Sequence, residues 1–209
     1  RGRGVYIINM FSGDHYNLSD NEKYELSRSP TAKEVVIDIF NDSLNSSYQR
    51  TSAAKDMFFK GVWSYFEDES RDYLKALVVN LEAMAEEHKS GSGKVRDYEL
   101  TELVKKIRPI LYPGKYDLFE SASDIRAAYP DIADDAISIL AYIPGGLENI
   151  SQMIRASIKR DGKWGHIENS HRFVDIIRGL NVGDAGVLRL LKSIADDPSY
   201  DNLTMQRLA

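Results

Sequence analysis

The sequence contains no cysteine in its 209 residues. This absence excludes disulfide bonds, cysteine nucleophiles, thiolate zinc sites and iron–sulfur clusters. The sequence also lacks any uninterrupted apolar run of the roughly 18 residues that read as a transmembrane helix. No signal-peptide layout is present, and the first residue is Arg1 rather than methionine, so we expect part of the natural chain to precede it. We therefore expect a soluble, intracellular (cytoplasmic) protein rather than a secreted one.

Proline is scarce, and positive charges are fewer than negative ones. There are 6 prolines, and 27 Lys and Arg residues face 32 Asp and Glu residues, for a net charge of -5. This acidic balance argues against a uniformly basic surface, although it leaves room for a local basic patch. Hydrophobic residues make up 43% of the chain, which is enough for a sizeable core in one large domain or two small ones.

Recognisable catalytic motifs are missing as well. There is no Gly-x-Ser-x-Gly elbow and no dinucleotide-binding glycine pattern, and the Gly-Ser-Gly-Lys stretch ending at Lys94 lacks the spacing of a phosphate-binding loop. His166 and His171 are five positions apart, so on a helix they would point about 140° away from each other. We therefore predict no catalytic residue, no metal site and no cofactor, and we favour a binding protein over an enzyme.

The densest apolar stretch runs from Ala53 to His88, without proline and with a single glycine, Gly61. Apolar residues recur in it at spacings of three and four: Phe58, Val62, Tyr65, Phe66, Leu74, Leu77, Val78, Leu81 and Met84. This spacing predicts a long central α-helix. Carboxylates crowd between Glu67 and Asp72, so we expect a kink or break near Glu67 to Ser70. The alternative is that a new helix starts there, with Asp68 or Ser70 as its N-cap.

Shorter elements are expected around this helix. Val5 to Phe11 is rich in β-branched and aromatic residues, which predicts one short N-terminal β-strand or extended arm. Thr31 and Glu34 have the spacing of a capping box at the start of a helix. Further helices are predicted over 98–111, 118–129, 131–143, 147–160, 173–180 and 185–194. The predicted fold class is mainly α, a multi-helix, bundle-like domain around a long central helix.

The turn at 112–116 is the best candidate for a boundary. It would separate an N-terminal helical half over 31–111 from a C-terminal helical half over 117–209. Residues 1–30 would form the N-terminal strand or arm and an irregular segment. The two halves could equally share one core and form a continuous domain.

Two groups of residues are candidates for binding. The first is an aromatic-rich segment that would either fill the core or dock a partner: Met57, Phe58, Phe59, Trp63, Tyr65 and Phe66. The second lies between positions 155 and 192, a region that contains eight basic and four acidic residues. Its candidate nucleic-acid-binding residues are Arg155, Lys159, Arg160, Lys163, Trp164, Arg172 and Arg178, because phosphate contacts need clustered cations and an indole ring can stack on a base.

The turn Pro144-Gly145-Gly146 joins two predicted helices and resembles the turn of a helix-turn-helix, a resemblance shared by any two helices joined by a tight glycine turn. Two functions follow from these features. The first is a non-enzymatic α-helical interaction or assembly protein that acts through protein–protein contacts with a protein partner or with itself as a homo-oligomer. The alternative is a helical nucleic-acid-binding protein, genome-coating or helix-turn-helix-like, that uses the basic region.

Overall fold

The computed structural model describes residues 2–13, 16–45, 51–91, 99, 104, 106–107, 128–141, 143, 145–158, 179–180 and 183–196. Its α-helices are α1 Gly2–Ser12, α2 Asp20–Ser27, α3 Pro30–Asn45, α4 Thr51–Phe59, α5 Glu67–Lys89, α8 Pro130–Leu140, α9 Gly146–Ile158 and α11 Ala185–Ala195. A 3-10 helix, η1, spans Val62–Tyr65. The mainly helical fold class is confirmed, and these ranges contain no strand.

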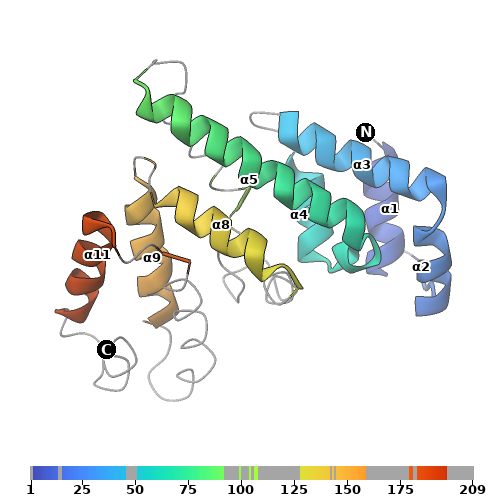
Figure 1. Ribbon diagram of the computed structural model, residues 1–209. Helices are drawn as coiled ribbons and strands as arrows, with labels where there is room; N and C mark the ends of the chain where they lie inside the picture. The colour runs from blue at the N-terminus through green and yellow to red at the C-terminus, as the bar shows by residue number, and fades with distance from the viewer. Residues whose placement is uncertain are drawn as a thin grey trace.

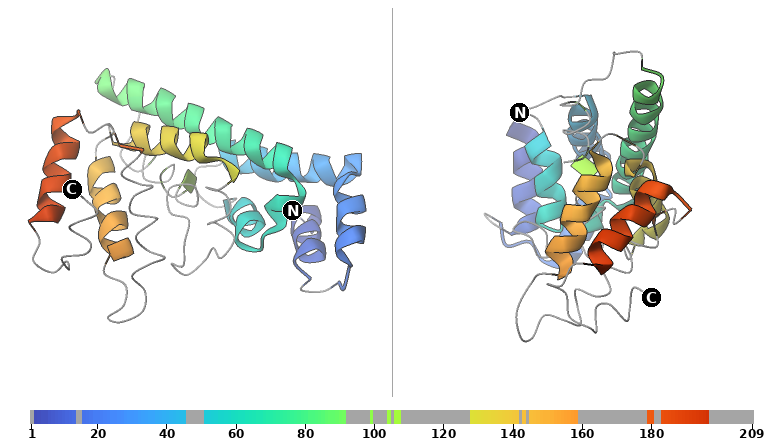
Figure 2. Two further views of the ribbon diagram at one scale, coloured as in Figure 1. Left: turned by 60° about the horizontal axis from the view of Figure 1, so that its bottom comes forward. Right: turned by 90° about the vertical axis from the view of Figure 1, so that its left-hand side faces the viewer.

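The helices form an elongated body around α5 (Figure 1). Helix α8 lies along α5 and runs in the same direction, from the end near α4 toward the end near α9. Helices α1 to α3 gather at one end of the long axis, and α9 and α11 stand at the other, as the second set of views also shows (Figure 2). Buried side chains from α1 through α11 belong to one hydrophobic cluster. The division at 112–116 stays a prediction, because those residues lie outside the described ranges.

Helix α5 is the long central helix that the sequence predicts. Its buried stripe recurs at spacings of three and four: Ser70, Tyr73, Leu74, Leu77, Val78, Leu81 and Ala85. Glu67, Asp68 and Glu69 occupy its first turn, whereas His88 and Lys89 occupy its last. Acids near an N-terminus and bases near a C-terminus both complement the helix dipole. The carboxylates therefore begin this helix instead of breaking one.

The helix predicted from Ala53 to His88 is interrupted earlier than expected. Helix α4 ends at Phe59, and Gly61 takes a left-handed conformation with φ of +68°. Glycine reaches this conformation without steric penalty, which makes it the usual residue just past a helix end. The 3-10 helix η1 follows, and α5 starts at Glu67 after Phe66. The N-cap is thus Phe66, in place of the expected Asp68 or Ser70.

The prediction of an N-terminal strand is wrong. Val5 to Phe11 lies within α1, whose buried residues Ile7, Ile8 and Phe11 are spaced as on one helix face. Helix α1 packs on α3 and α4. A Cβ atom added at Gly4 would lie 3.0 Å from the Ile39 side chain, so the two helices approach closely there. Tertiary packing has overridden the β propensity of this segment.

The segment before α3 is more ordered than its polar composition suggested. Helix α2 begins with a capping box, in which Ser19 and Glu22 satisfy each other's backbone amides. The side chain of Ser29 accepts a hydrogen bond from the Ala32 amide at 3.2 Å, and α3 begins at Pro30. The cap of α3 is therefore Ser29 instead of the predicted Thr31, with proline in the first turn, where its missing N–H is harmless.

The C-terminal helices agree with the sequence to within a few residues. Helices α8, α9 and α11 correspond to the predictions over 131–143, 147–160 and 185–194. Asp184 caps α11 by accepting hydrogen bonds from the amides of Gly186 and Val187 at 2.7 and 3.1 Å. The helices predicted over 98–111, 118–129 and 173–180 lie largely outside the described residues.

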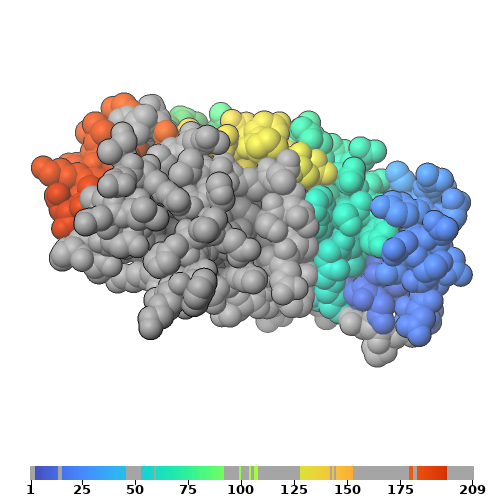
Figure 3. Space-filling view, turned by 90° about the horizontal axis from the view of Figure 1, so that it is seen from below, coloured from blue at the N-terminus to red at the C-terminus, as the bar shows by residue number. Residues whose placement is uncertain are grey.

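Polar contacts fasten the start of α8 to the start of α5. The Tyr129 hydroxyl donates to the Glu67 carbonyl oxygen at 3.0 Å, and the Arg71 guanidinium lies 4.9 Å from the centre of the Tyr129 ring. Arg71 also pairs with Asp131 at 3.4 Å. These contacts bring the two halves of the sequence together at the middle of the molecule, where α8 lies beside α4 and α5 when seen from below (Figure 3).

Candidate functional site

The aromatic-rich segment lies mainly in the core. Met57, Phe58, Trp63 and Phe66 are buried, and Tyr65 is partly exposed. The side chain of Phe59 lies outside the description. Four of the six proposed docking residues therefore have no surface to offer, and the burial supports the alternative that this segment fills the core.

A stack of aromatic rings explains this burial. Tyr73 lies 4.4 Å from Phe40 and 6.0 Å from Phe58, centroid to centroid, with small angles between the ring planes. Trp63 continues the series, 6.4 Å from Phe58 and 6.1 Å from Tyr129. Ring pairs at such separations add about 0.5–1.5 kcal/mol each beyond the area they bury. The segment thus joins α3, α4, α5 and the start of α8.

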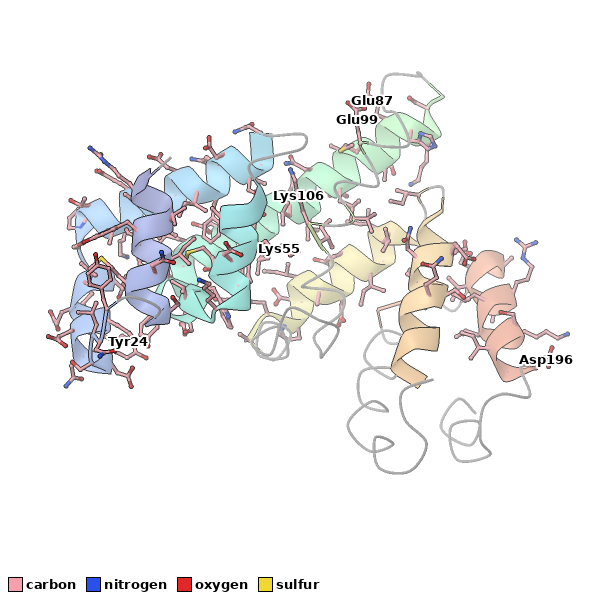
Figure 4. The ribbon with its side chains drawn as sticks, turned by 180° about the vertical axis from the view of Figure 1, so that it is seen from behind. Tyr24, Lys55, Glu87, Glu99, Lys106 and Asp196 are labelled. Carbon is pink, nitrogen blue, oxygen red and sulfur yellow. The ribbon has the colours of Figure 1, made fainter. Side chains whose placement is uncertain are left out.

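A small polar network sits inside this apolar stack. The hydroxyl groups of Tyr73 and Ser43 are 3.0 Å apart and buried. Burial raises the pKa of Tyr73 to about 12, although the bond to Ser43 lowers it somewhat. The Lys106 ammonium donates to the Ser43 carbonyl oxygen near the end of α3 (Figure 4). Cations suit helix C-termini, so Lys106 fastens its segment to α3.

Trp63 carries the one described buried side-chain donor without a partner. Its indole Nε1 has no hydrogen-bond partner. A buried donor in this state typically costs about 1–3 kcal/mol. The surroundings are the rings of Phe58 and Tyr129. The remaining buried polar side chains of the described ranges satisfy their hydrogen bonds.

Tyrosines are exposed at the N-terminal end. The rings of Tyr6 and Tyr16 meet at 5.4 Å and those of Tyr24 and Tyr65 at 5.2 Å, with Tyr24 beside α1 and α2 (Figure 4). Burial and the charge of Asp20 raise the pKa of Tyr65, whose hydroxyl donates to Asp20 at 3.3 Å. Tyr24 and Tyr65 thus join α2 to η1, whereas Tyr6 and Tyr16 join α1 to the segment that follows it.

The candidate nucleic-acid residues lie mostly outside the described ranges. Six of the seven lie outside these ranges: Lys159, Arg160, Lys163, Trp164, Arg172 and Arg178. The seventh, Arg155, is described only by its backbone in α9. His166 and His171 are also outside. Where the structure is described, no group of three potential metal ligands comes together, and no helix there is both long and apolar enough for a bilayer.

The turn between α8 and α9 is as tight as the sequence predicted. Gly145 has φ of +72°, and the Asn149 side chain donates to the Gly145 carbonyl oxygen at 2.9 Å. Early in α9, Ser151 is buried and Gln152 donates to Glu148 at 3.3 Å. These side chains serve local structure, and the acid at Glu148 would repel a phosphate.

An acidic helix face is exposed at the N-terminal end of the molecule. The exposed residues of α3 are Pro30, Thr31, Glu34, Ile37, Asp38, Asn41, Asp42 and Asn45, without a single cation. Ile37 is 44% exposed at the centre of this face. The nearby Lys33 is engaged by Glu69 at 3.0 Å, so it does not neutralise the face. We call these residues the α3 face.

A basic helix face is exposed at the opposite end. The exposed residues of α11 are Ala185, Leu188, Arg189, Lys192 and Ser193, without an acid among them. Leu188 is 52% exposed and stands beside Arg189. Neither Arg189 nor Lys192 forms an ion pair with a described residue. We call these residues the α11 face.

Arg189 and Lys192 are two of the eight basic residues between positions 155 and 192, whereas the sequence alone did not mark Ile37 and Leu188 as candidates. The missed signal is a residue that falls outside the apolar stripe of its helix. Ile37 follows Val35 and Val36, which are buried, and precedes Ile39, also buried. An aliphatic residue on the polar side of such a stripe is a candidate contact residue.

Comparison with known proteins adds no functional information. No protein-family model, no curated protein and no solved structure matches this chain.

Proposed function

We propose that this chain is a non-catalytic α-helical assembly protein that works through protein–protein contacts and associates with copies of itself. The observation that carries the proposal is the pair of exposed helix faces of opposite charge at the two ends of the elongated body (Figure 2). Single exposed aliphatic residues are ordinary. Ile37 and Leu188 are distinguished by the charges beside them, Glu34 and Asp38 in one case and Arg189 and Lys192 in the other, which form no ion pair with a described residue.

Electrostatics explains why such faces favour association. Glu34 and Asp38 on the α3 face and the two cations of the α11 face form no ion pair with a described residue. Each face therefore weakly repels the same face of a second copy and attracts the opposite face of that copy. Complementary charges guide encounter and select register, and burial of an apolar centre adds affinity. The net charge of -5 leaves long-range repulsion between chains, which salt would screen.

A salt series tests this function. We expect size-exclusion chromatography with light scattering to give masses above the 23.7 kDa monomer in about 50 mM salt, falling toward it in about 500 mM salt. The control is Val79→Asp, because Val79 is 61% exposed on α5 but lies on neither face. This variant should behave as wild type. A mass of one chain at every salt concentration and high protein concentration would refute self-association.

Nucleic-acid binding is the second candidate. The observation in its favour is that Arg189 and Lys192, both from the basic region, are exposed and unpaired with any described acid. It predicts retention on heparin and binding that weakens steeply with salt. Replacing Lys159, Arg160 and Lys163 together by glutamate should abolish that binding. Charge reversal on the α3 face should leave it intact, which separates this function from self-association.

A further inference from the structure

We infer that the partner of the α11 face is the α3 face of a second copy, so that chains join head to tail. This inference rests on the proposed self-association and specifies which surfaces meet. The two faces belong to different helices at opposite ends, so the contact is heterologous. A heterologous contact leaves one free face at each end of a pair and continues into a ring or an open chain.

Helix geometry gives the register of this contact. Residues three or four positions apart lie one above the other on a helix face. Glu34 is one turn before Ile37 on α3, and Lys192 is one turn after Leu188 on α11. Suppose that the two helices cross in antiparallel orientation with Ile37 facing Leu188. The residue one turn before Ile37 then lies opposite the residue one turn after Leu188.

The second pair of charges follows in the same orientation. Asp38 comes one position after Ile37, and Arg189 comes one position after Leu188. In an antiparallel pair, the position following each central residue falls on the same side of the contact. Glu34 thus faces Lys192, and Asp38 faces Arg189. A parallel crossing would place Glu34 away from Lys192, so the charge spacing selects the antiparallel one.

The other exposed apolar surfaces do not offer an equal match. The tyrosines near α1 and α2 contact one another, and Val79 on α5 has Lys75 one turn before it and Glu82 one turn after it, charges of opposite sign. Val5 on α1 is 55% exposed, but Arg3 is the one charged residue of that helix. Within the part of the chain that the structure describes, α3 and α11 are the helices that present an exposed aliphatic residue beside two or more charges, all of one sign.

Charge exchange at one pair tests the register. Every junction of a head-to-tail assembly contains one α3 face and one α11 face, so a single chain can carry both halves of an exchange. Glu34→Lys alone and Lys192→Glu alone each place like charges together and should weaken association at least about tenfold. The double variant Glu34→Lys with Lys192→Glu should return association to within about threefold of wild type.

A mismatched exchange is the control. Glu34→Lys combined with Arg189→Glu reverses the same kinds of charge without making them face each other, and it should stay weak. The pair Asp38→Lys with Arg189→Glu provides an independent repeat if a variant at position 34 fails to fold. Sedimentation velocity at low salt is the readout throughout.

The outcomes distinguish the head-to-tail register from self-association in general. Rescue in the matched but not in the mismatched double variant supports the head-to-tail register. Additive losses without rescue, in a wild-type chain that does associate, overturn this inference and leave self-association standing. A wild-type chain that is monomeric at every concentration overturns both.

Discussion

Tyr73 takes part in both the aromatic stacking and the buried hydrogen bonding of this core. Its ring stacks on Phe40 and Phe58, while its hydroxyl group meets Ser43. The ring contributes apolar burial, and the hydroxyl satisfies a buried serine that would otherwise lack a partner. A buried phenol is held in its neutral form, because the anion is poorly solvated there. This explains why burial raises the pKa of Tyr73 from 10.0 to about 12.

Replacing Tyr73 by phenylalanine should change how stability depends on alkaline pH. A group whose pKa is higher in the folded state contributes stability that is present below its unfolded pKa and is lost as pH rises to the folded one. For Tyr73 this window runs from pH 10.0 to about 12. In urea unfolding, Tyr73→Phe should be less stable than wild type by about 1 kcal/mol at pH 8, through the lost hydrogen bond.

Above pH 10 the difference should shrink by on the order of 2–3 kcal/mol, and it should change sign by pH 12. The control is Tyr24→Phe, because Tyr24 is 53% exposed. That variant should keep the alkaline slope of wild type. A Tyr73→Phe variant that loses stability in parallel with wild type across this range would show that the phenol is not held neutral by burial.

Among elements, the turn from α8 to α9 is where an added Cβ atom would come closest to the backbone of the described chain. A Cβ atom at Gly146 would lie 1.7 Å from the carbonyl oxygen of Leu140, which is backbone and cannot rotate away. Gly145, one residue earlier, requires a positive φ but has open space around its Cβ position. The two glycines are thus needed for different reasons.

Alanine substitutions should separate these reasons. Gly146→Ala should lower the free energy of unfolding by about 3 kcal/mol or more, because the clash can be relieved only by moving the backbone. Gly145→Ala should lower it by only about 1–2 kcal/mol, the penalty for a left-handed alanine. Urea unfolding monitored by circular dichroism measures both. Equal losses in the two variants would contradict the close approach at Gly146.

Local patterns predicted those elements whose stripe of apolar residues matched their final packing. Helix α5, with Leu74, Leu77 and Leu81 on one face, is such an element. Local patterns failed to predict those elements whose structure depends on tertiary contacts. The segment from Val5 to Phe11 favours a strand by composition, yet α3 and α4 offer it a surface that fits a helix. The break at Gly61 was missed because one glycine within a helical pattern is often tolerated.

The candidate site was less predictable than the fold, because exposure depends on how helices orient around a core. The aromatic residues at positions 57–66 are equally suited to a core and to an interface, and only packing places Met57 and Phe66 inside. The charges of the α3 and α11 faces are visible in the sequence. Their location at opposite ends requires the folded arrangement.

At the scale of the whole molecule, elongation and opposed end charges together predict an open assembly. A chain in which one of the two faces is disabled can still bind to the end of an assembly through its other face. Because it then presents no functional face to the next chain, it blocks further growth at that end. Leu188→Asp places an acid in the centre of the α11 face and leaves the α3 face intact. Added at about one part in ten, it should shorten the assemblies measured by light scattering, whereas Val79→Asp at the same fraction should not. Equal effects of the two additives would argue against growth through α11.

The most direct measurement is the sedimentation velocity of the wild-type chain over a concentration series at low salt. Head-to-tail joining predicts a weight-average sedimentation coefficient that rises continuously with concentration, because each added chain presents a new free face. A coefficient that stays at the value of a 23.7 kDa monomer across the series would contradict head-to-tail association. A plateau at twice that mass would contradict the open geometry and indicate a closed dimer.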